Sequence, residues 1–502
     1  MKRLLALLLI ILMVSVSLVA CGSNTDESKN ESNGTTSNTS ENSSDTSEPD
    51  ENNISHLEGL DFGGADVVFY VEGDATFTYR SMDIMPHEEG FEEINEAVKV
   101  RNQKIEDLLN VKIVERRAAA EGEIMANVRA DNAEADIIMP YMPVAATLAS
   151  ESMLLSLNID DPNANFKISD IIKLDKPYWD QRANQDLSIA NNLFIGVGDF
   201  GILTMDCAHA IVFNKTLLES DNTLDDPYEL LFNGKWTHDA LMRNAKKVTK
   251  ESDGEDGMTY KDTWGFYVNQ NYCTTLYVGS GLRLTNKDKD DYPELGIANE
   301  QAANVIDKIA SLYNDSTMTL KIEEIPLAGS GYSSVWVAAS DRFATGNVLF
   351  RACAIIDLRD LLSYEVQYGI LPTPKYTEEQ EEYRNILSAV YAAGVSIPVT
   401  ASDIKKSAAV VEALSYYSTD TVRLEYYERI LKAQRMEDTN GEKALDMIFN
   451  NRVYELGAIY SWNNLNTFVN EVISSGQYQS TLDAKKDLYQ TAIDNTILAY
   501  KN

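Results

Sequence analysis

Cysteine, histidine and positive charge are all scarce in this chain of 502 residues. Its four cysteines form no CxxC pair, its four histidines form no HExxH motif, and no G-x-S-x-G elbow occurs. The usual zinc and serine-hydrolase motifs are therefore missing, and we expect no catalytic residue, no bound metal and no cofactor. Paired carboxylates stay open as an alternative among 78 acidic residues, because spacing alone does not reveal them.

Lysine and arginine number 43 against 78 aspartates and glutamates, so the formal net charge is −35 at pH 7. A polyanion is a poor partner for nucleic acid or anionic lipid, because binding either requires neutralising phosphate groups. We therefore expect no nucleic-acid partner. The charge is spread along the chain and favours solubility and outward exposure.

An apolar run at the start of the chain is too short to cross a bilayer. Lys2 and Arg3 precede residues 4–19, which are apolar apart from two serines, whereas a spanning helix needs about 20 apolar residues. The run is followed by a small residue and then Cys21, the layout of a secretory signal peptide. This layout resembles the lipobox of bacterial lipoproteins. The resemblance implies a signal peptide at residues 1–20, a palmitate-type lipid on Cys21 and a location on the extracytoplasmic face of the cell membrane.

The segment after the lipobox contains no apolar or aromatic side chain. From residue 22 to residue 53 none of Ala, Val, Ile, Leu, Met, Phe, Trp, Tyr or Cys occurs. Such a stretch cannot offset its ordering entropy, so we expect residues 21–56 to form a disordered tether. A flexible chain of this length reaches roughly 30–35 Å. A generic disordered terminus is the alternative, but it does not explain why the segment begins at the lipobox.

The remaining residues, 57–502, are too many for one hydrophobic core, and we expect two lobes. The three cysteines in this part, Cys207, Cys273 and Cys353, lie far apart. We favour three buried thiols, and one disulfide pair among them is the alternative.

Short apolar runs alternate with helical periodicity over the first part of this region. The predicted strands are residues 65–71, 111–114 and 135–139, and the predicted helices are 91–109 and 124–130. Alternating strands and helices predict a parallel sheet covered on both faces, with ligands beyond the carboxyl ends of the strands. Further along, the predicted strands are 208–213, 263–268, 347–353 and 368–371, and the predicted helices are 237–249, 300–313 and most of the chain from 404 onward.

Residues 196–201 match G-x-G-x-x-G and resemble a dinucleotide fingerprint. That motif needs a helix directly after it to receive the pyrophosphate. Residues 202–205 are predicted to be extended, so we favour a hinge in which the glycines let a crossing strand flex and approach ligand closely.

Six segments follow one another in an order that is more specific than any of them alone. They are residues 94–106, 135–138 (Asp then two apolar), 212–215 (aromatic-Asn-Lys), 235–241 (Trp-Thr helix start, with Thr237 or Asp239 as cap), 343–350 (F-x-x-G) and 368–374 (G-x-x-P). Together they resemble the family-one extracellular solute-binding proteins of ABC importers, which include many sugar-binding lipoproteins. The pattern departs at residues 351–354, where many relatives carry a Gly-Pro-Trp-like turn that faces ligand.

The resemblance implies an α/β fold of the two-lobed, type II periplasmic-binding-protein kind. Each lobe should be a mostly parallel sheet flanked by helices, with a helical C-terminal region. Lobe 1 should hold residues 57–200 and about 392–420, and lobe 2 residues 201–391 and about 421–502. The chain should cross between lobes near 196–204, 391–399 and 417–424, and the lobes should close on ligand like a hinge.

Sugar sites combine aromatic faces with polar side chains that bind hydroxyl groups. The candidate ligand-binding residues are Tyr79, Arg80, Tyr141, Asp199, Trp264, Tyr267, Asn269, Tyr272, Arg351, Trp462 and Asn463. Each aromatic residue could equally be a packing residue, and the two lone charges could equally be exposed or paired. We expect at least one of the clusters to line the cleft.

These observations favour a monomeric, lipid-anchored protein that binds an oligosaccharide or similar polar solute and passes it to ABC permease subunits, without catalysis. One alternative is a surface-anchored glycan-active enzyme, which would need two carboxyl groups roughly 5–10 Å apart across the cleft. Another is a sensor or adhesion lipoprotein that binds but does not serve a permease.

Overall fold

The structure is a computed structural model that describes residues 53–74, 76–87, 91–120, 122–132, 134–436 and 438–501. The predicted signal peptide, the lipidation site Cys21 and nearly all of the predicted tether lie outside these residues. The described part falls within one compact unit, residues 52–502. Within it, no helix is both long enough and apolar enough to cross a membrane.

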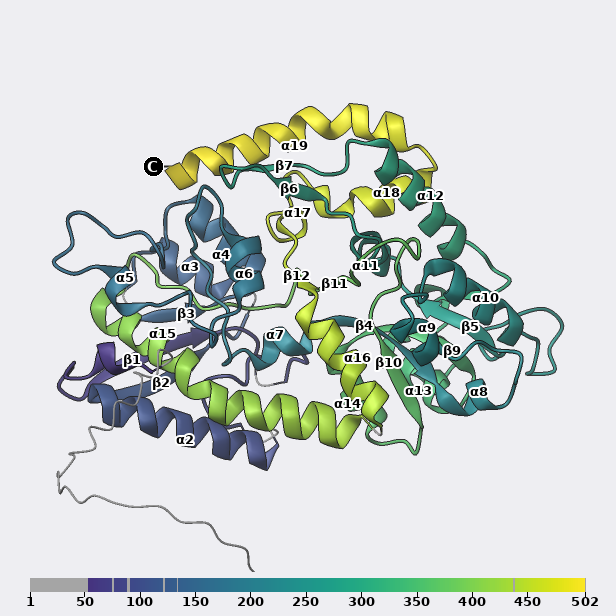
Figure 1. Cartoon of the computed structure of the whole chain (residues 1–502), viewed down its shortest axis with the longest axis horizontal. Coiled ribbons are helices and arrows are strands. Elements are labelled where there is room, and N and C mark those ends of the chain that lie inside the picture. Colours follow the sequence, from purple (N-terminus) through teal and green to yellow (C-terminus); the bar gives the residue numbers. More distant parts are fainter. Residues whose placement is uncertain are drawn as a thin grey trace, which may run out of the picture. The chain divides into compact units, whose positions relative to one another are not determined.

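The first lobe is built on a three-stranded parallel sheet in the order β2-β1-β3 (Figure 1). Its strands are β1 (Ala65–Val71), β2 (Val111–Arg117) and β3 (Ile137–Met139), and its helices include α2 (Glu92–Leu109), α3 (Glu123–Arg129), α4 (Met142–Ser150), α5 (Ile168–Ile171) and α6 (Gln181–Leu187). The alternating strands and helices that the sequence predicts here, and the parallel sheet they imply, are confirmed.

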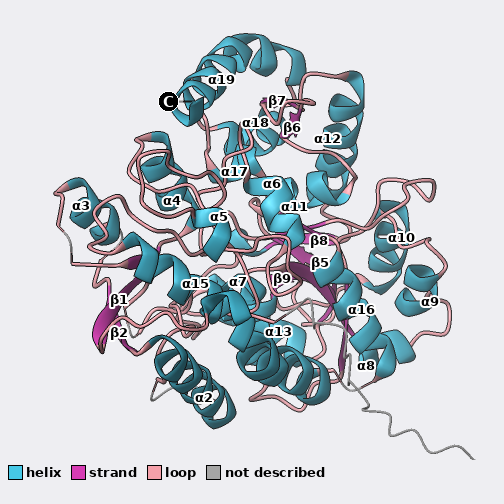
Figure 2. Ribbon diagram, turned by 60° about the vertical axis from the view of Figure 1, so that its left-hand side comes forward, coloured by secondary structure: helices cyan, strands magenta, loops and turns pink. Residues whose placement is uncertain are grey.

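The second lobe is built on a five-stranded sheet in the order β10-β4-β9-β5-β8. Its strands are β4 (His209–Asn214), β5 (Trp264–Val268), β8 (Thr319–Lys321), β9 (Val348–Ala354) and β10 (Tyr368–Leu371). Strand β4 is antiparallel to both β9 and β10, so this sheet is mixed rather than mostly parallel. Figure 2 shows the strands of the two sheets as separate groups surrounded by helices.

Helices cover the second sheet and make up most of the C-terminal region, as the sequence predicts. Those between the strands are α8 (Lys215–Glu219), α9 (Pro227–Phe232), α10 (His238–Val248), α11 (Tyr272–Gly279), α12 (Glu300–Tyr313), α13 (Val335–Ala344) and α14 (Leu358–Leu361). Helix α10 begins where Thr237 Oγ1 accepts a hydrogen bond from the Ala240 N–H, which confirms the predicted helix start.

After β10, the last strand of the second sheet, helix α15 (Ile404–Ser418) passes without a break into a π-helical segment, η5 (Thr419–Arg435). In Figure 1 the two run as one long helix beside α2, which packs against both. The chain ends with α16 (Thr439–Asn450), α17 (Leu456–Ile459), α18 (Phe468–Ser475) and α19 (Tyr478–Lys501), and with two small sheets made of β6 (Thr285–Lys287) and β7 (Pro293–Leu295), and of β11 (Asn385–Ile386) and β12 (Arg452–Val453).

The chain leaves and re-enters the first lobe through two crossing segments that pair with each other. Gly196 and Val395 exchange two backbone hydrogen bonds of 2.8 Å, and Ser396 pairs with Ile138 of β3. A Cβ on Gly198 would lie 2.0 Å from the Ser415 hydroxyl oxygen. Glycine is therefore required here for close packing against α15. The residue boundaries predicted for the two lobes stay predictions.

The prediction of extended chain after the G-x-G-x-x-G motif is wrong. Residues Ile202–Asp206 form a short helix, α7. Its first N–H groups are capped from the first lobe, because Asp83 Oδ1 accepts hydrogen bonds from Ile202 N (2.5 Å) and Leu203 N (3.3 Å). A carboxylate 119 residues away in sequence thus occupies the position that a pyrophosphate takes in a dinucleotide site, and sequence periodicity does not reveal such a cap.

Two hydrophobic clusters form the core. One face of the first sheet, including Val67 and Phe69, packs with α15, and the other face, including Tyr70, joins a larger cluster that continues through the second lobe. The three cysteines of the described region are buried and unpaired, which confirms the favoured prediction of buried thiols over a disulfide.

Candidate functional site

Three tyrosines and a phenylalanine meet where the strands of the first sheet end. Tyr79 lies in the loop after β1, and Tyr141 follows β3 closely. Tyr391, from the returning crossing segment, stacks on Tyr79 with ring centroids 4.3 Å apart. Tyr141 contacts Tyr391 edge-on at 5.6 Å, and its hydroxyl donates to the backbone oxygen of Tyr79 at 3.1 Å. Phe77, which is 36 % exposed, also contacts Tyr391 edge-on. We call Phe77, Tyr79, Tyr141 and Tyr391 the aromatic cluster.

A second pair of rings comes from the second lobe. Tyr272 opens α11, four residues after the end of β5, and stacks on His209 with centroids 4.6 Å apart. His209 begins β4, which places it opposite Ala354, the last residue of β9. Burial lowers the pKa of His209 to about 4, so its ring is neutral at physiological pH. The pair therefore presents flat, uncharged faces at the carboxyl ends of β5 and β9.

An ion pair between a buried arginine and a half-buried aspartate lies close to both sets of rings. Arg351 of β9 is 2 % exposed, and its Nη2 lies 3.9 Å from Asp357 Oδ2, just beyond the end of the strand. Burial raises the pKa of Tyr79, and the charge of Asp357 raises it further. Burial also raises the pKa of Tyr272, with further contributions from Asp357 and Tyr79. Side chains from the two lobes are thus within electrostatic reach of one another.

The chemistry of this arrangement suits a polar, uncharged ring compound. Aromatic faces bind the apolar face of a sugar ring, while guanidinium and carboxylate groups donate to and accept from its hydroxyls. No group of three or more His, Cys, Asp or Glu side chains in the described ranges is placed to hold a metal ion.

Four of the residues predicted from sequence meet here: Tyr79, Tyr141, Tyr272 and Arg351. Arg80 is next to the cluster, and its Nη1 donates to the backbone oxygen of Phe77 at 2.9 Å. Of the two alternatives to a ligand role for Arg351, an exposed charge and a paired one, the structure shows the paired one, because the side chain is buried and its Nη2 lies 3.9 Å from Asp357 Oδ2.

Three predicted residues near β5 have structural contacts of their own. Trp264 is buried, and its Nε1 donates to the backbone oxygen of Thr259. Tyr267 is fully buried, and its hydroxyl donates to the Tyr260 oxygen. Asn269 is buried, and its Oδ1 accepts from the N–H of Tyr272 and so supports the start of α11.

Trp462 and Asn463 lie against the C-terminal helix rather than beside the aromatic cluster. The Trp462 Nε1 donates to Thr496 Oγ1 of α19 at 2.9 Å, and its ring stacks on Tyr460. The Asn463 amide donates to the backbone oxygen of Leu488, also in α19.

Sequence reasoning missed Tyr391, His209 and Asp357. Tyr391 had a usable signal, since it stands at the start of the predicted returning segment. Asp357 follows the end of a predicted strand, which is where the fold rule places ligand groups. His209 carries no local signal, because only the stacking with Tyr272 distinguishes it from an isolated histidine.

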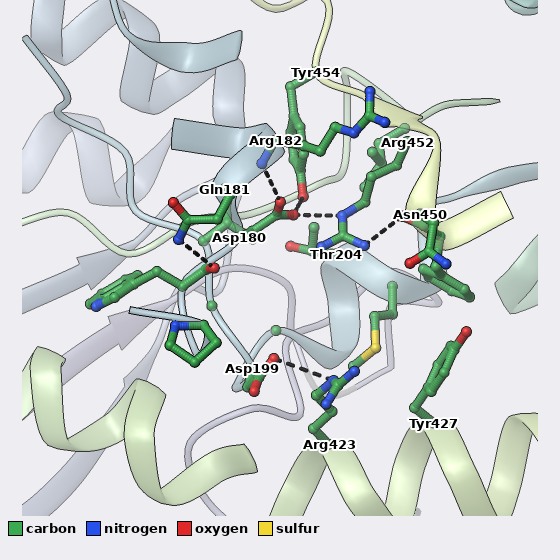
Figure 3. Close-up of a pocket in the computed structure, with 18 of the residues that line it drawn as sticks. Asp180, Gln181, Arg182, Asp199, Thr204, Arg423, Tyr427, Asn450, Arg452 and Tyr454 are labelled. Carbon is green, nitrogen blue, oxygen red and sulfur yellow. Dashed lines mark hydrogen bonds and ion pairs between the residues drawn. The ribbon is translucent and has the colours of Figure 1, made fainter. Parts of the chain in front are cut away.

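A separate cavity of about 500 Å³ lies beside α7 (Figure 3). Its walls come from the start of α6, the outgoing crossing segment, η5, the end of α16 and β12. Asp180 caps α6 and also accepts hydrogen bonds from Arg452 Nε at 2.5 Å and the Tyr454 hydroxyl at 2.6 Å. The predicted site residue Asp199 lines this cavity. It accepts from Thr419 Oγ1 at 2.8 Å, and burial raises its pKa to about 6.

No protein-family model and no curated protein matches the sequence. Solved structures do resemble the fold. They include the sugar-binding protein MalE from Xanthomonas citri, at a TM-score of 0.55 and 13 % identity, with 86 % of this chain and 97 % of that chain covered. An ABC substrate-binding protein from Listeria monocytogenes in complex with cycloalternan has a TM-score of 0.52 and 12 % identity, with 85 % and 99 % covered. A cyclo/maltodextrin-binding protein complexed with maltotetraose has a TM-score of 0.51 and 12 % identity, with 87 % and 96 % covered.

At these identities the likeness establishes the fold alone. The chain has the two-lobed α/β fold of periplasmic binding proteins, and the predicted fold class is confirmed.

Proposed function

We propose that this chain is an extracytoplasmic solute-binding protein that holds an oligosaccharide, or a similar polar solute, at the aromatic cluster. The observation that carries the proposal is the presence of two stacked ring pairs at the strand ends, Tyr79 with Tyr391 and Tyr272 with His209. The charge of Asp357 raises the pKa of both Tyr79 and Tyr272, which supports their placement at one site. In α/β folds the ligand site lies beyond the carboxyl ends of the strands, and both sets of rings are there. The structural neighbours named above, one a sugar-binding protein and the others in complex with cycloalternan and with maltotetraose, support the same solute class.

The two-sided arrangement of rings provides a mechanism for capture. A solute that contacts both lobes stabilises the arrangement in which the lobes are close, and one that contacts a single lobe does not. Binding then requires no chemical step. Two acids near the cluster, the half-buried Asp357 and the buried Asp206, are engaged, Asp357 with Arg351, and Asp206 with Arg359 and the Tyr426 hydroxyl. That engagement favours binding over the general acid and base roles that a glycan-active enzyme needs.

The proposed family, lipid anchor and permease partners rest on the sequence. We infer that the chain is a member of the family-one solute-binding proteins, a monomer that delivers solute to ABC permease subunits. It would be anchored by a lipid on Cys21 and held off the membrane by the tether at residues 21–56. The order of the six resembling segments and the lipobox-like start support these inferences.

A thermal-shift screen of the purified full-length chain tests the solute class. Maltooligosaccharides and other oligosaccharides are expected to raise the midpoint of unfolding, whereas short peptides are not. A ligand present at 100 times its Kd stabilises the folded state by about 2.7 kcal/mol, which is a shift of several degrees in a small domain and less in a large one. A shift with peptides and none with any carbohydrate would contradict the proposal.

A Cys21→Ser variant tests the anchor. Wild-type chain produced in a bacterial host that lipidates lipoproteins is expected to sediment with membranes and to incorporate labelled palmitate. The variant lacks the thiol that accepts the lipid and is expected to do neither. Equal membrane association of the two proteins would count against a lipid anchor at this cysteine.

A further inference from the structure

The cavity beside α7 is distinct from the aromatic cluster. None of the four residues of that cluster lines it, and neither do His209 and Tyr272. Its volume of about 500 Å³ lies within the range of small-molecule sites in proteins. The cavity is therefore a candidate for a second binding site, separate from the solute site at the aromatic cluster.

The acidic side chains that line the cavity are already engaged. Asp180 Oδ1 accepts two backbone N–H bonds at the start of α6, and its Oδ2 accepts from Arg452 and Tyr454. Glu428 and Asp446 each pair with Lys432, at 3.2 and 2.7 Å. The acceptors of the cavity wall are thus largely used within the protein.

The guanidinium group of Arg423, by contrast, keeps donors available. Arg423 Nε lies 3.3 Å from Asp199 Oδ1, but neither Nη of Arg423 has a hydrogen bond to any residue that the structure describes. Arg452 uses Nε for Asp180 and Nη1 for the Phe449 oxygen at 2.6 Å, and its guanidinium also interacts with the Tyr454 hydroxyl, so it contributes mainly positive charge to the cavity wall. Figure 3 shows Arg423 reaching the cavity from η5 and Arg452 reaching it from the opposite wall.

We propose that this cavity binds a small molecule bearing an oxyanion, a carboxylate or a phosphate, between Arg423 and Arg452. A guanidinium fork matches the geometry of these groups and binds them with two parallel hydrogen bonds. In Arg423 the pairing of Nε with Asp199 orients the side chain and leaves both Nη groups for the ligand, while Arg452 adds positive charge from the opposite wall. The exposed amide of Asn450 and the ring of Tyr427 complete the wall on the second-lobe side. The site is independent of the solute site proposed above.

Isothermal titration of the full-length chain with inorganic phosphate and with citrate, at ionic strength matched with chloride, tests the proposal. Saturable one-to-one binding of at least one anion is expected. Binding of phosphate would indicate a phosphate-bearing ligand, and binding of citrate would indicate a carboxylate-bearing one. Arg423→Gln removes the positive charge and the guanidinium fork and is expected to weaken binding at least tenfold. Arg429→Gln is the matched control, because Arg429 lies on the same helix, is 63 % exposed and pairs with Glu425.

A second variant keeps the test decisive if Arg423→Gln fails to fold. Asn450→Glu adds a negative charge at an exposed lining position without breaking either ion pair, and it is also expected to weaken anion binding. Tyr79→Ala should leave anion binding unchanged, so a failure here is distinguishable from a failure of the solute site. Absence of saturable binding for both anions, or equal affinity in wild type and both cavity variants, would overturn the proposal.

Discussion

Alanine in place of Tyr79 is expected to weaken solute binding by tenfold to a hundredfold. The ring of Tyr79 stacks on Tyr391 and lies within electrostatic reach of Tyr272 from the other lobe, so it stands at the centre of the proposed site. A lost aromatic face removes about 1.5–3 kcal/mol of burial and stacking, which is about one to two powers of ten in Kd. The solute is the compound with the largest thermal shift, and its Kd is measured by isothermal titration.

Two matched variants separate the stacking role from a general loss of packing. Tyr79→Phe keeps the ring and should bind within a few-fold of wild type. Tyr376→Ala removes a half-buried tyrosine that is not part of the cluster, and it should leave the Kd unchanged. If the Tyr79→Ala and Tyr376→Ala proteins bound the solute equally well, the aromatic cluster would not be the site.

Alanine in place of Asp83 is expected to lower the free energy of unfolding by about 3 kcal/mol. Asp83 caps α7 by accepting hydrogen bonds from two N–H groups, and its negative charge compensates the positive charge of the buried Arg101. The Arg101 Nη1 also donates to the Asp83 backbone oxygen at 2.6 Å. Losing a helix cap costs about 1 kcal/mol, and leaving a buried charge uncompensated costs several kcal/mol more. Water that enters the space left by the carboxylate offsets part of this second cost. Urea unfolding of wild type and variant measures the difference.

Asparagine at the same position distinguishes the cap from the charge. Asp83→Asn keeps an oxygen for the Ile202 and Leu203 N–H groups, but like alanine it leaves the buried Arg101 without the opposite charge. Because the cap is worth about 1 kcal/mol, we expect asparagine to cost about 2 kcal/mol. Asp239→Ala, at a 66 % exposed acid paired with Lys308, should change stability by less than about 0.5 kcal/mol. Equal losses for alanine and asparagine would mean that the cap does not matter.

Local elements were predictable because their signals are local. Helix α12 and strand β10 have the bounds that the sequence predicts, since apolar periodicity and flanking turn residues decide both. Helix α7 was not predictable, because its cap comes from Asp83 in the other lobe. The direction of β4 was not predictable either, since it depends on where the chain enters the second sheet.

The candidate site was predictable in part for the same reason. Tyr79, Tyr141 and Tyr272 follow predicted strands, and the position of a strand end says where a side chain is available to ligand. Whether an aromatic residue there faces the site or the core is a matter of tertiary packing. Trp462 illustrates this point, because the helix that covers it, α19, begins sixteen residues later.

The sequence by itself determined the α/β class, the order of most strands and helices, and the lipobox-like start, since these follow from residue type and spacing along the chain. Only the tertiary structure decided which rings meet at the strand ends, which carboxylate caps α7, and that Asp199 and Arg423 share a cavity apart from the aromatic cluster. Those contacts join residues from tens to more than three hundred positions apart, and their energies depend on distances that no local pattern encodes.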